Sequence, residues 1–267
     1  MMEILITSFD IGSVNFAYYS ELVNLCKFNK LRKKYVALKN PQKKSQHNFF
    51  VNKVCKIGKR VSTGVISLSD IILCNDTTSD EKFMCKKGVY SEESRRKLLQ
   101  YLNSNEGMWN ESGAIVIEQQ FFATFGHKKL VQVNMNAIKI AEDVMMYFMI
   151  KFPDKLVCIF SAALKTSVLC CPKKLSKIQR KKWACEKSYE IYTKRSDKEA
   201  QYAYELCEKV KRKRKLDGFI NEYENFVKDK DILKLCEKIV KEKQKLDDTS
   251  DALVQLQAFK FKKMLCD

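Results

Sequence analysis

The stretch Ile4-Leu5-Ile6-Thr7-Ser8-Phe9-Asp10-Ile11-Gly12-Ser13 decides how the rest of the chain is interpreted. Its apolar run ends on a single carboxylate, Asp10, and Gly12 follows two residues later. A short apolar run bounded by a turn residue predicts a buried strand. A carboxylate at the end of such a strand is costly to bury unless another group pairs with it. The position of Asp10 therefore predicts a binding partner, and two further acidic stretches indicate which kind.

The two further stretches also lie at the ends of regular elements. Ile-Val-Ile-Glu ends a second apolar run at Glu118, and Asp-Asp-Thr-Ser-Asp at 247–251 opens the last apolar helix. Asp251 follows Asp248 by three residues and Asp247 by four, so both pairs share a helix face. Like charges this close raise each other's pKa unless a cation lies between them. Together with Asp10, these acids predict one metal-binding cluster.

The residue types indicate which metal the cluster binds. The chain has only two histidines, and carboxylate oxygens are hard ligands, so Mg²⁺ or Mn²⁺ is expected in place of zinc. Two such ions, about 4 Å apart, activate a water and stabilise the leaving oxygen in phosphodiester cleavage. Each acidic stretch alone has a simpler interpretation. The Asp247-Asp248 doublet is typical of a helix start, and Glu118 could be an exposed edge residue.

The composition points to a polyanionic partner. The 267 residues include 50 Lys+Arg against 32 Asp+Glu, a formal charge of +18. Nucleic acid is the leading candidate, although a lysine-rich solvated surface would give the same balance. Eleven cysteines without C-x-x-C spacing predict reduced thiols in an intracellular compartment. No secretory signal or membrane-spanning run is expected.

Hydrophobic periodicity predicts an α/β layered fold in a single domain, 1–267, with parallel and antiparallel strand pairs. Strands are expected over residues 3–9, 15–21, 61–73, 113–118 and 156–160, the first two as a hairpin. Helices are expected over residues 92–102 with Ser91 as N-cap, 128–152 before Pro153, and 246–264. The helix over 128–152 is apolar on more than one face. Either a partner subunit or the chain's own insertions cover the second face, and we favour a homodimer.

Two basic insertions interrupt this pattern, at 22–60 and 173–245. The first combines basic residues with Phe28, Tyr35, Phe49 and Phe50. This combination suits a surface that binds along a nucleic-acid strand and stacks on its bases. Its alternative is an irregular solvated insertion whose aromatic rings pack on the sheet. The second is predicted to form two or three helices, with either a solvated or a phosphate-tracking face. The candidate nucleic-acid-binding residues are Lys33, Lys34, Lys43, Lys44, Lys59, Arg60, Lys173 and Lys174.

Three motifs in this order resemble a known family. Ser-Phe-Asp-Ile-Gly at 8–12, Ile-Glu-Gln-Gln at 117–120 and Asp-Asp-Thr-Ser-Asp-Ala-Leu at 247–253 are similar to motifs of the RuvC-like Holliday junction resolvases. These enzymes belong to the ribonuclease H superfamily, and the poxvirus and fungal-mitochondrial members are the most similar kind. The resemblance covers residues 3–73, 114–165 and 246–259 and leaves both basic insertions unexplained.

The resemblance implies a ribonuclease H-like mixed five-stranded sheet flanked by helices and a homodimer that nicks opposed strands of a four-way DNA junction. By this likeness Asp10, Glu118, Asp248 and Asp251 are catalytic metal ligands for two Mg²⁺ ions, with Mn²⁺ as a possible substitute. Asp247 is a candidate fifth ligand. Lys165 corresponds to a family lysine that contacts the scissile phosphate, although it could be an ordinary surface residue. Gln119 and Gln120 would line the pocket or cap the strand end.

Three functions remain open from the sequence. The first is a magnesium-dependent junction resolvase acting in recombination and repair, at a viral replication site or in a mitochondrion or nucleus. The second keeps the fold but cleaves RNA:DNA hybrids or transfers DNA strands as a transposase does. The third is a basic protein that binds nucleic acid without cutting it, which the clustered carboxylates disfavour.

Overall fold

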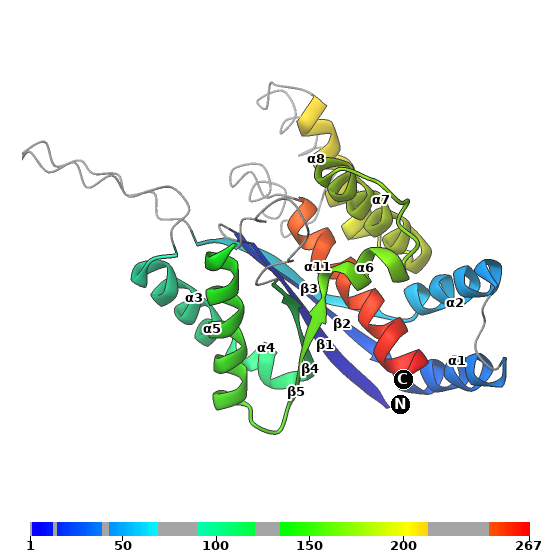
Figure 1. The fold of residues 1–267 in the computed structure, drawn as a ribbon, viewed down its shortest axis with the longest axis horizontal. Helices are drawn as coiled ribbons and strands as arrows, with labels where there is room; N and C mark the ends of the chain where they lie inside the picture. Colours follow the sequence, from blue (N-terminus) through cyan, green and yellow to red (C-terminus); the bar gives the residue numbers. More distant parts are fainter. Residues whose placement is uncertain (1, 13–14, 39–42, 69–89, 121–133, 213–245) are drawn as a thin grey trace, which may run out of the picture.

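A mixed five-stranded sheet forms the centre of the protein. The computed structural model describes residues 2–12, 15–38, 43–68, 90–120, 134–212 and 246–267. The strands are β1 (Glu3–Ile11), β2 (Asn15–Asn24), β3 (Lys59–Ser67), β4 (Ser112–Gln119) and β5 (Leu156–Ser161), in the order β3-β2-β1-β4-β5 (Figure 1). β1 and β2 form the predicted hairpin, β2 and β3 are antiparallel, and β1, β4 and β5 are parallel. The predicted mixed five-stranded sheet flanked by helices is thus confirmed.

β1 is central because its side chains are buried on both faces of the sheet. Residues 5–11 are all buried, and the run is apolar except at Thr7, Ser8 and Asp10. The Thr7 hydroxyl lies 2.7 Å from the Ser20 hydroxyl on β2 and 2.8 Å from that of Ser112 on β4. Since buried polar groups need hydrogen-bond partners, these hydroxyls satisfy one another inside the sheet. Their hydrogen bonds also link the three central strands β2, β1 and β4.

One face of the sheet is covered by α3 (Glu92–Ser104), α4 (Glu106–Glu111) and α5 (Met135–Lys151), as Figure 1 shows. Phe9 of β1 packs there against Trp109 and Phe148, with ring centroids 5.4 Å away in both cases. Ser91 caps α3 as predicted, because its side chain accepts a hydrogen bond from the Ser94 backbone N–H. The short α4 was not predicted from the sequence.

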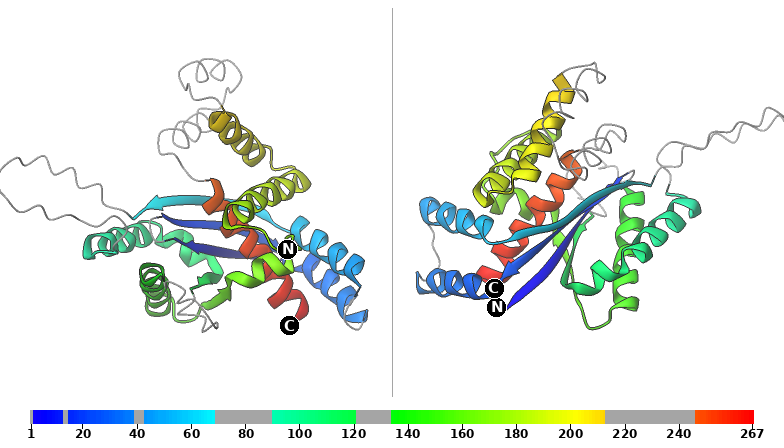
Figure 2. Two further views of the ribbon diagram at one scale, coloured as in Figure 1. Left: turned by 45° about the horizontal axis from the view of Figure 1, so that its top comes forward. Right: turned by 180° about the vertical axis from the view of Figure 1, so that it is seen from behind.

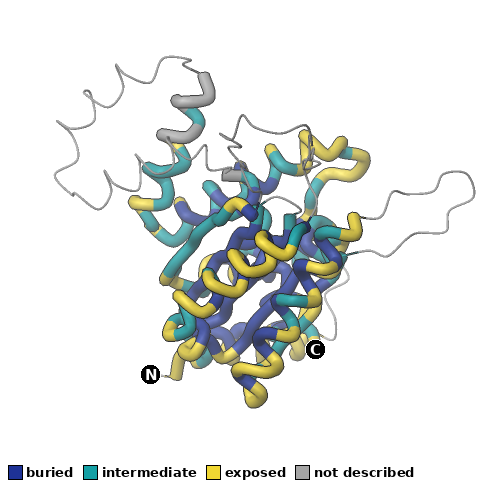
Figure 3. The backbone as a smooth tube through the Cα atoms, turned by 90° about the vertical axis from the view of Figure 1, so that its left-hand side faces the viewer, coloured by how far each residue is buried: buried dark blue, intermediate teal, exposed yellow. Residues whose placement is uncertain are grey.

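The other face is crossed by α11 (Leu246–Phe259), which continues as the π-helix η1 (Lys260–Cys266). α6 (Ala162–Val168) and α7 (Lys177–Arg195) pack against α11, and α8 (Lys198–Arg212) packs on α7 (Figure 2). Two further helices, α1 (Leu25–Ala37) and α2 (Lys44–Lys56), contact η1. α11 is buried along nearly its whole length, because it lies between the sheet and α7. Figure 3 shows the buried segments in the interior of the molecule, with exposed segments around them. The predicted helix over 246–264 therefore exists and lies in the core.

The first basic insertion is helical, which neither sequence-based alternative predicted, and most of its aromatic rings pack in the core, as the second alternative expected. β2 runs to Asn24, whose side chain accepts from the Lys27 backbone N–H and so caps α1 (Leu25–Ala37); α2 (Lys44–Lys56) follows. The segment is helical, not irregular, because Phe28, Leu31 and Tyr35 recur at helical spacing and are buried together. Phe50 is also buried, so most of its aromatic rings serve packing and are not free to stack on bases.

The boundaries of several other elements differ from the predicted ones. β3 ends at Ser67, and the remainder of the predicted strand 61–73 beyond Leu68 lies outside the described residues. α5 starts at Met135, capped by Asn134, and ends at Lys151; residues 128–133 of the predicted helix lie outside the description. In the second insertion α7 and α8 are helices as predicted, and residues 213–245 lie outside the described ranges. Within the part described, no helix has the length and apolar character to cross a membrane.

A buried ionic group joins the sheet to the helical face. Glu21 of β2 is fully buried and accepts from Arg195 of α7 at 2.7 Å and from Lys260 at the start of η1. Burial opposes ionisation, but the two cations outweigh it and lower the pKa of the Glu21 carboxyl. Gly58 has φ of +150°, and a Cβ there would lie 2.7 Å from Glu21 Oε1, so only glycine fits this turn.

Candidate functional site

The parallel pairing of β1 and β4 sets Asp10 and Glu118 side by side. Phe9 pairs with Ile117, and both side chains face the α3–α5 core. Because successive residues of a strand point to opposite faces, Asp10 and Glu118 both point to the face covered by α11. The first turns of α11 carry Asp248 and Asp251. The fold thus brings carboxylates from three elements to one end of the sheet.

Lys165 of α6 lies among three of these carboxylates. Its ammonium nitrogen is 2.9 Å from Glu118 Oε1, 3.1 Å from Asp251 Oδ1 and 3.4 Å from Asp10 Oδ1. Since all three oxygens contact one atom, they lie in one neighbourhood, as the sequence predicted for Asp10, Glu118 and Asp251. The Lys165 side chain is only 11% exposed, so it is not an ordinary surface lysine.

A second cation, Lys181 of α7, binds the remaining acids. Its ammonium contacts Asp247 and lies 3.4 Å from Asp248 Oδ1. The other oxygen of Asp248, Oδ2, accepts a hydrogen bond of 2.8 Å from the Asn15 amide at the start of β2. Asp248 is buried, whereas Asp247 is partly exposed on the Lys181 side. Asp247 therefore belongs to the rim of the cluster, next to Lys181.

Excess negative charge dominates the electrostatics, because five carboxylates face two ammonium groups. Burial and the neighbouring Glu118 raise the pKa of Asp10 well above its ordinary value, against the opposing effect of Lys165. Burial likewise raises the pKa of Asp251. Burial alone would lower the pKa of Lys165, but Glu118, Asp10 and Asp251 outweigh it and raise that pKa, so the ammonium stays charged. The cluster lacks positive charge, which a bound cation would supply.

The donor set fits a hard divalent cation, although the side chains are arranged around Lys165. Within the described ranges, no group of three or more His, Cys, Asp or Glu side chains is placed to hold a metal ion directly. The oxygens of Asp10, Glu118 and Asp251 are instead turned toward the lysine nitrogen. Carboxylates are the ligands that Mg²⁺ and Mn²⁺ prefer, so these three residues and Asp248 are the ones that would hold ions.

Two glutamines fix the orientation of the cluster. The Gln120 amide donates to Glu118 Oε2 at 3.0 Å and to the Ile11 carbonyl at 3.3 Å, as expected for a donor lining the site. Gln119, its neighbour, is exposed. Gln255 of α11 is fully buried and donates to Ser8 Oγ at 3.0 Å and to the Phe9 carbonyl at 3.1 Å. These bonds hold the second half of α11 against the end of β1.

Sequence reasoning missed three of these residues. Asn15 and Gln255 contact the site only through the hairpin turn and the position of α11, and neither has a signal of its own. Lys181 lies in the basic run 173–182, in which the sequence does not distinguish one lysine from another. Ser188 of α7 donates to the Ser250 carbonyl of α11 at 3.4 Å, so its face of α7 is turned toward α11. Lys181 lies seven residues, or about two helical turns, before Ser188 and therefore shares that face. That face becomes recognisable only once the helix pairing is known.

The basic candidates are divided between two places. Lys33, Lys34, Lys43, Lys44 and Lys59 are exposed in and around α1 and α2, and Lys173 and Lys174 are exposed between α6 and α7. The Leu25 N–H bonds the Met2 carbonyl, so α1 starts at the opposite end of the sheet from Asp10. Arg60, the remaining candidate, is paired with two acids of this chain. Its guanidinium binds Asp197 at 2.8 Å and Glu199 at 2.6 Å, so it anchors the start of α8.

Comparisons with known proteins give distant likenesses. No protein-family model matches the chain. A protein of invertebrate iridescent virus 3, named "Uncharacterized protein 97L", is 27% identical over 198 residues, which cover 72% of this chain and 87% of that protein. The fowlpox virus resolvase, solved in complex with Holliday junction DNA, is 13% identical with a TM-score of 0.42, covering 99% of this chain and all of that one. RuvC of Thermus thermophilus is 10% identical with a TM-score of 0.35, covering 65% and 74%. Likenesses at this level do not decide a function.

Proposed function

We propose that this protein is a divalent-metal-dependent endonuclease that cuts branched DNA, a Holliday junction resolvase. The observation that carries the proposal is the convergence of Asp10, Glu118 and Asp251 around one buried ammonium. Burying several carboxylates together is unfavourable for folding, so a chain that does so in one place uses them for binding or catalysis. The three motifs that resemble the resolvases supply these same residues.

The chain's residues divide the work of cleavage between them. Asp10, Glu118, Asp248 and Asp251 would bind Mg²⁺ or Mn²⁺. The bound ions would activate the attacking water and stabilise the leaving oxygen. Lys165, once its carboxylate partners bind ions, can turn its ammonium to the scissile phosphate. Gln120 keeps Glu118 oriented throughout, because its second hydrogen bond is to the backbone of β1.

The charge of the chain supports a nucleic-acid substrate, and the resemblance of its motifs to the resolvases supports DNA. At +18, the chain attracts phosphates strongly, and Lys173 and Lys174 lie in the exposed segment that directly follows the helix of Lys165. The lysines of α1 and α2 add a second basic surface at the far end of the sheet. A four-way junction spreads its arms over a wide area, so two separate basic surfaces suit it. Such an enzyme would act at a viral replication site or in a mitochondrion or nucleus.

The proposal includes a homodimer. α5 buries Ile140, Val144 and Phe148 against the sheet, yet Met146, Met149 and Ile150 on its other side are 50% to 71% exposed. On the same face of the sheet as α5, the edge strand β5 exposes Ile159, which pairs with Ile117 of the α3–α5 core. Exposed apolar residues gathered on one face in this way mark interaction sites. A second copy covering them would carry a second carboxylate cluster, which paired nicks on opposed strands require.

The test is a cleavage assay with matched substrates. Purified protein is incubated with a mobile four-way junction, a linear duplex and an RNA:DNA hybrid, each with magnesium or with EDTA. We expect symmetrical nicks in the junction only, in magnesium only, and none with Glu118→Gln. Glu111→Gln, an exposed acid at the other end of β4, is the control and should cut normally. Cleavage of the hybrid instead would indicate the second kind of nuclease, and binding of the junction without cleavage would refute a nuclease.

A further inference from the structure

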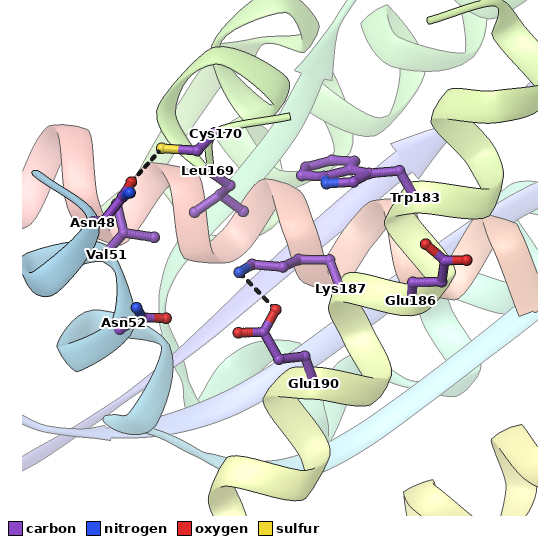
Figure 4. Close-up of a pocket in the computed structure, with 9 residues that line it drawn as sticks. All are labelled: Asn48, Val51, Asn52, Leu169, Cys170, Trp183, Glu186, Lys187 and Glu190. Carbon is purple, nitrogen blue, oxygen red and sulfur yellow. Dashed lines mark hydrogen bonds and ion pairs between the residues drawn. The ribbon is translucent and has the colours of Figure 1, made fainter. Parts of the chain in front are cut away.

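A polar pocket separate from the carboxylate cluster lies between α2 and α7. Its volume is about 350 Å³. Asn48 and Asn52 of α2 form one side, Trp183 and Glu186 of α7 form the other, and Leu169 lies between them (Figure 4). Leu169 and Val51 are buried and give the pocket an apolar base. This size is in the usual range for small-molecule sites.

The polar groups of the pocket are oriented by their neighbours. Cys170 Sγ lies 3.0 Å from Asn48 Oδ1, and Lys194 donates to Asn52 Oδ1 at 2.6 Å. Because both amide oxygens accept these bonds, the N–H groups of both amides are the donors left for a ligand. On the opposite side, the carboxylate of Glu186 is 58% exposed and can accept. The pocket therefore offers donors and an acceptor beside an indole ring.

The charges of the pocket are balanced. Lys187 lies 2.9 Å from Glu190 Oε2, and Lys194 contacts the other oxygen. Burial would raise the pKa of Glu190, but the hydrogen bonds from Lys194 and Lys187 outweigh it and lower that pKa. With both ammonium groups paired, the pocket does not suit a phosphate. Its polar walls equally disfavour a purely apolar ligand, so a flat, uncharged ring with donors and acceptors fits best.

We propose that this pocket binds one unpaired nucleobase of a DNA strand, stacked on Trp183 and hydrogen-bonded by Asn48 and Asn52. Aromatic side chains bind bases of any sequence by stacking, and side-chain amides pair with base edges. The proposal rests on the proposed function for its choice of DNA, and it extends that function by giving the enzyme a contact with an unstacked base near the branch point.

The position of the pocket supports this ligand. α6 begins three residues before Lys165 and leads directly into Leu169 and Cys170 of the pocket. On α7, Trp183 follows Lys181, the rim cation, by two residues. α6 therefore carries Lys165 and leads into Leu169 at the base of the pocket, while α7 carries both Lys181 and the Trp183 wall. A strand whose phosphate lies at Lys165 would pass close to the pocket within a few nucleotides.

The test measures base-dependent binding, without cleavage. A fluorescently labelled six-nucleotide oligo-dT and an abasic strand with the same number of phosphates are titrated in EDTA by anisotropy. We expect Trp183→Ala to weaken oligo-dT binding by about 5- to 100-fold, the range for loss of one stacked base. Trp183→Phe should restore most of the affinity, which excludes a folding defect. The abasic strand should bind both variants equally.

Intrinsic fluorescence provides an independent readout. The chain has two tryptophans, and Trp109 is fully buried with its indole N–H bound to the Leu102 carbonyl at 2.8 Å. If oligo-dT quenches the tryptophan fluorescence and the abasic strand does not, the quenched residue is therefore Trp183. Asn48→Leu should weaken this quenching several-fold. Equal quenching by both strands would overturn the proposal.

The exposed ring of Phe49 is the matched control. It also lies on α2 but outside this pocket, and Lys53 lies over its face. If Phe49→Ala weakens oligo-dT binding and Trp183→Ala does not, bases stack elsewhere and the proposal fails. If base-dependent binding needs Trp183 but no junction is cut, the base-binding proposal stands and the proposed nuclease function fails. If Trp183→Ala cuts the junction and binds oligo-dT as tightly as the wild type, the proposed nuclease function stands and the base-binding proposal is refuted.

Discussion

Replacing Lys165 with methionine removes the ammonium that lies among Asp10, Glu118 and Asp251. Its ammonium contacts Asp10, Glu118 and Asp251, and methionine keeps much of its volume without the charge. Three carboxylates would then face one another with no cation between them. We expect the variant to be less stable than the wild type when metal is absent and to regain stability when magnesium is added.

The magnitude follows from the burial of the group. Lys165 is 11% exposed, so solvent screens its interactions little. Removing one partner of a buried ionic group costs about 3–5 kcal/mol. The folded-state pKa values of Asp10 and Asp251, already raised, would rise further. A raised carboxyl pKa favours folding in acid, so the loss should be small near pH 4 and grow toward pH 7.

Urea denaturation in EDTA and in magnesium measures both effects. With magnesium at about 100 times its Kd, the variant should regain about 2.7 kcal/mol. The wild type should gain less, because bound ions must first displace Lys165. Lys151→Met is the control: its pair with Glu106 is nearly half exposed on both sides, so we expect a loss below about 1 kcal/mol and no magnesium effect.

Two results would refute this reasoning. A loss for Lys165→Met no larger than that for Lys151→Met would mean that the carboxylates do not depend on the ammonium. A loss that magnesium does not reverse would mean that the cluster is a structural ionic network and does not bind the ion.

Three further predictions concern other charges. In EDTA, Asp10→Asn should be more stable than the wild type by about 1 kcal/mol at pH 8. This difference should disappear near pH 4, because the raised pKa of Asp10 leaves its carboxyl neutral in the folded protein there. A variant as stable as the wild type at both pH values would contradict charge repulsion in the cluster. Glu21→Gln should lose about 3–5 kcal/mol with or without magnesium, since Arg195 and Lys260 lose their buried partner, and urea denaturation would detect this. Changing four exposed lysines to Gln should weaken junction binding and reduce its salt slope by up to about 4, while an unchanged slope would show that they do not meet phosphate. These four are Lys33, Lys34, Lys43 and Lys44.

The sheet and the carboxylates of the site were accessible from the sequence. Asp10 and Glu118 each end an apolar run, and parallel strands that end together place such residues side by side. Asp251 was accessible because helical spacing joins it to Asp248. These are local patterns, and a local pattern is what a single sequence shows.

The helices α1 and α2 and the second cation were not accessible in the same way. The charges between Asn24 and Arg60 hid a helical repeat of Phe28, Leu31 and Tyr35, which the N-cap at Asn24 should have indicated. Lys181 and Arg60 are chosen from many basic residues by tertiary contacts alone. Arg60 binds Asp197 and Glu199, acids 137 and 139 positions away, and no spacing rule predicts such a pair.

The central claim is that the carboxylates of β1, β4 and α11 bind divalent ions. A crystal of the protein soaked in Mn²⁺, with anomalous scattering recorded, tests this most directly. The account predicts a manganese peak bound by Asp10 and Glu118, with Lys165 displaced from both. Lys165 still in contact with all three carboxylates at millimolar manganese, and no peak between them, would contradict it.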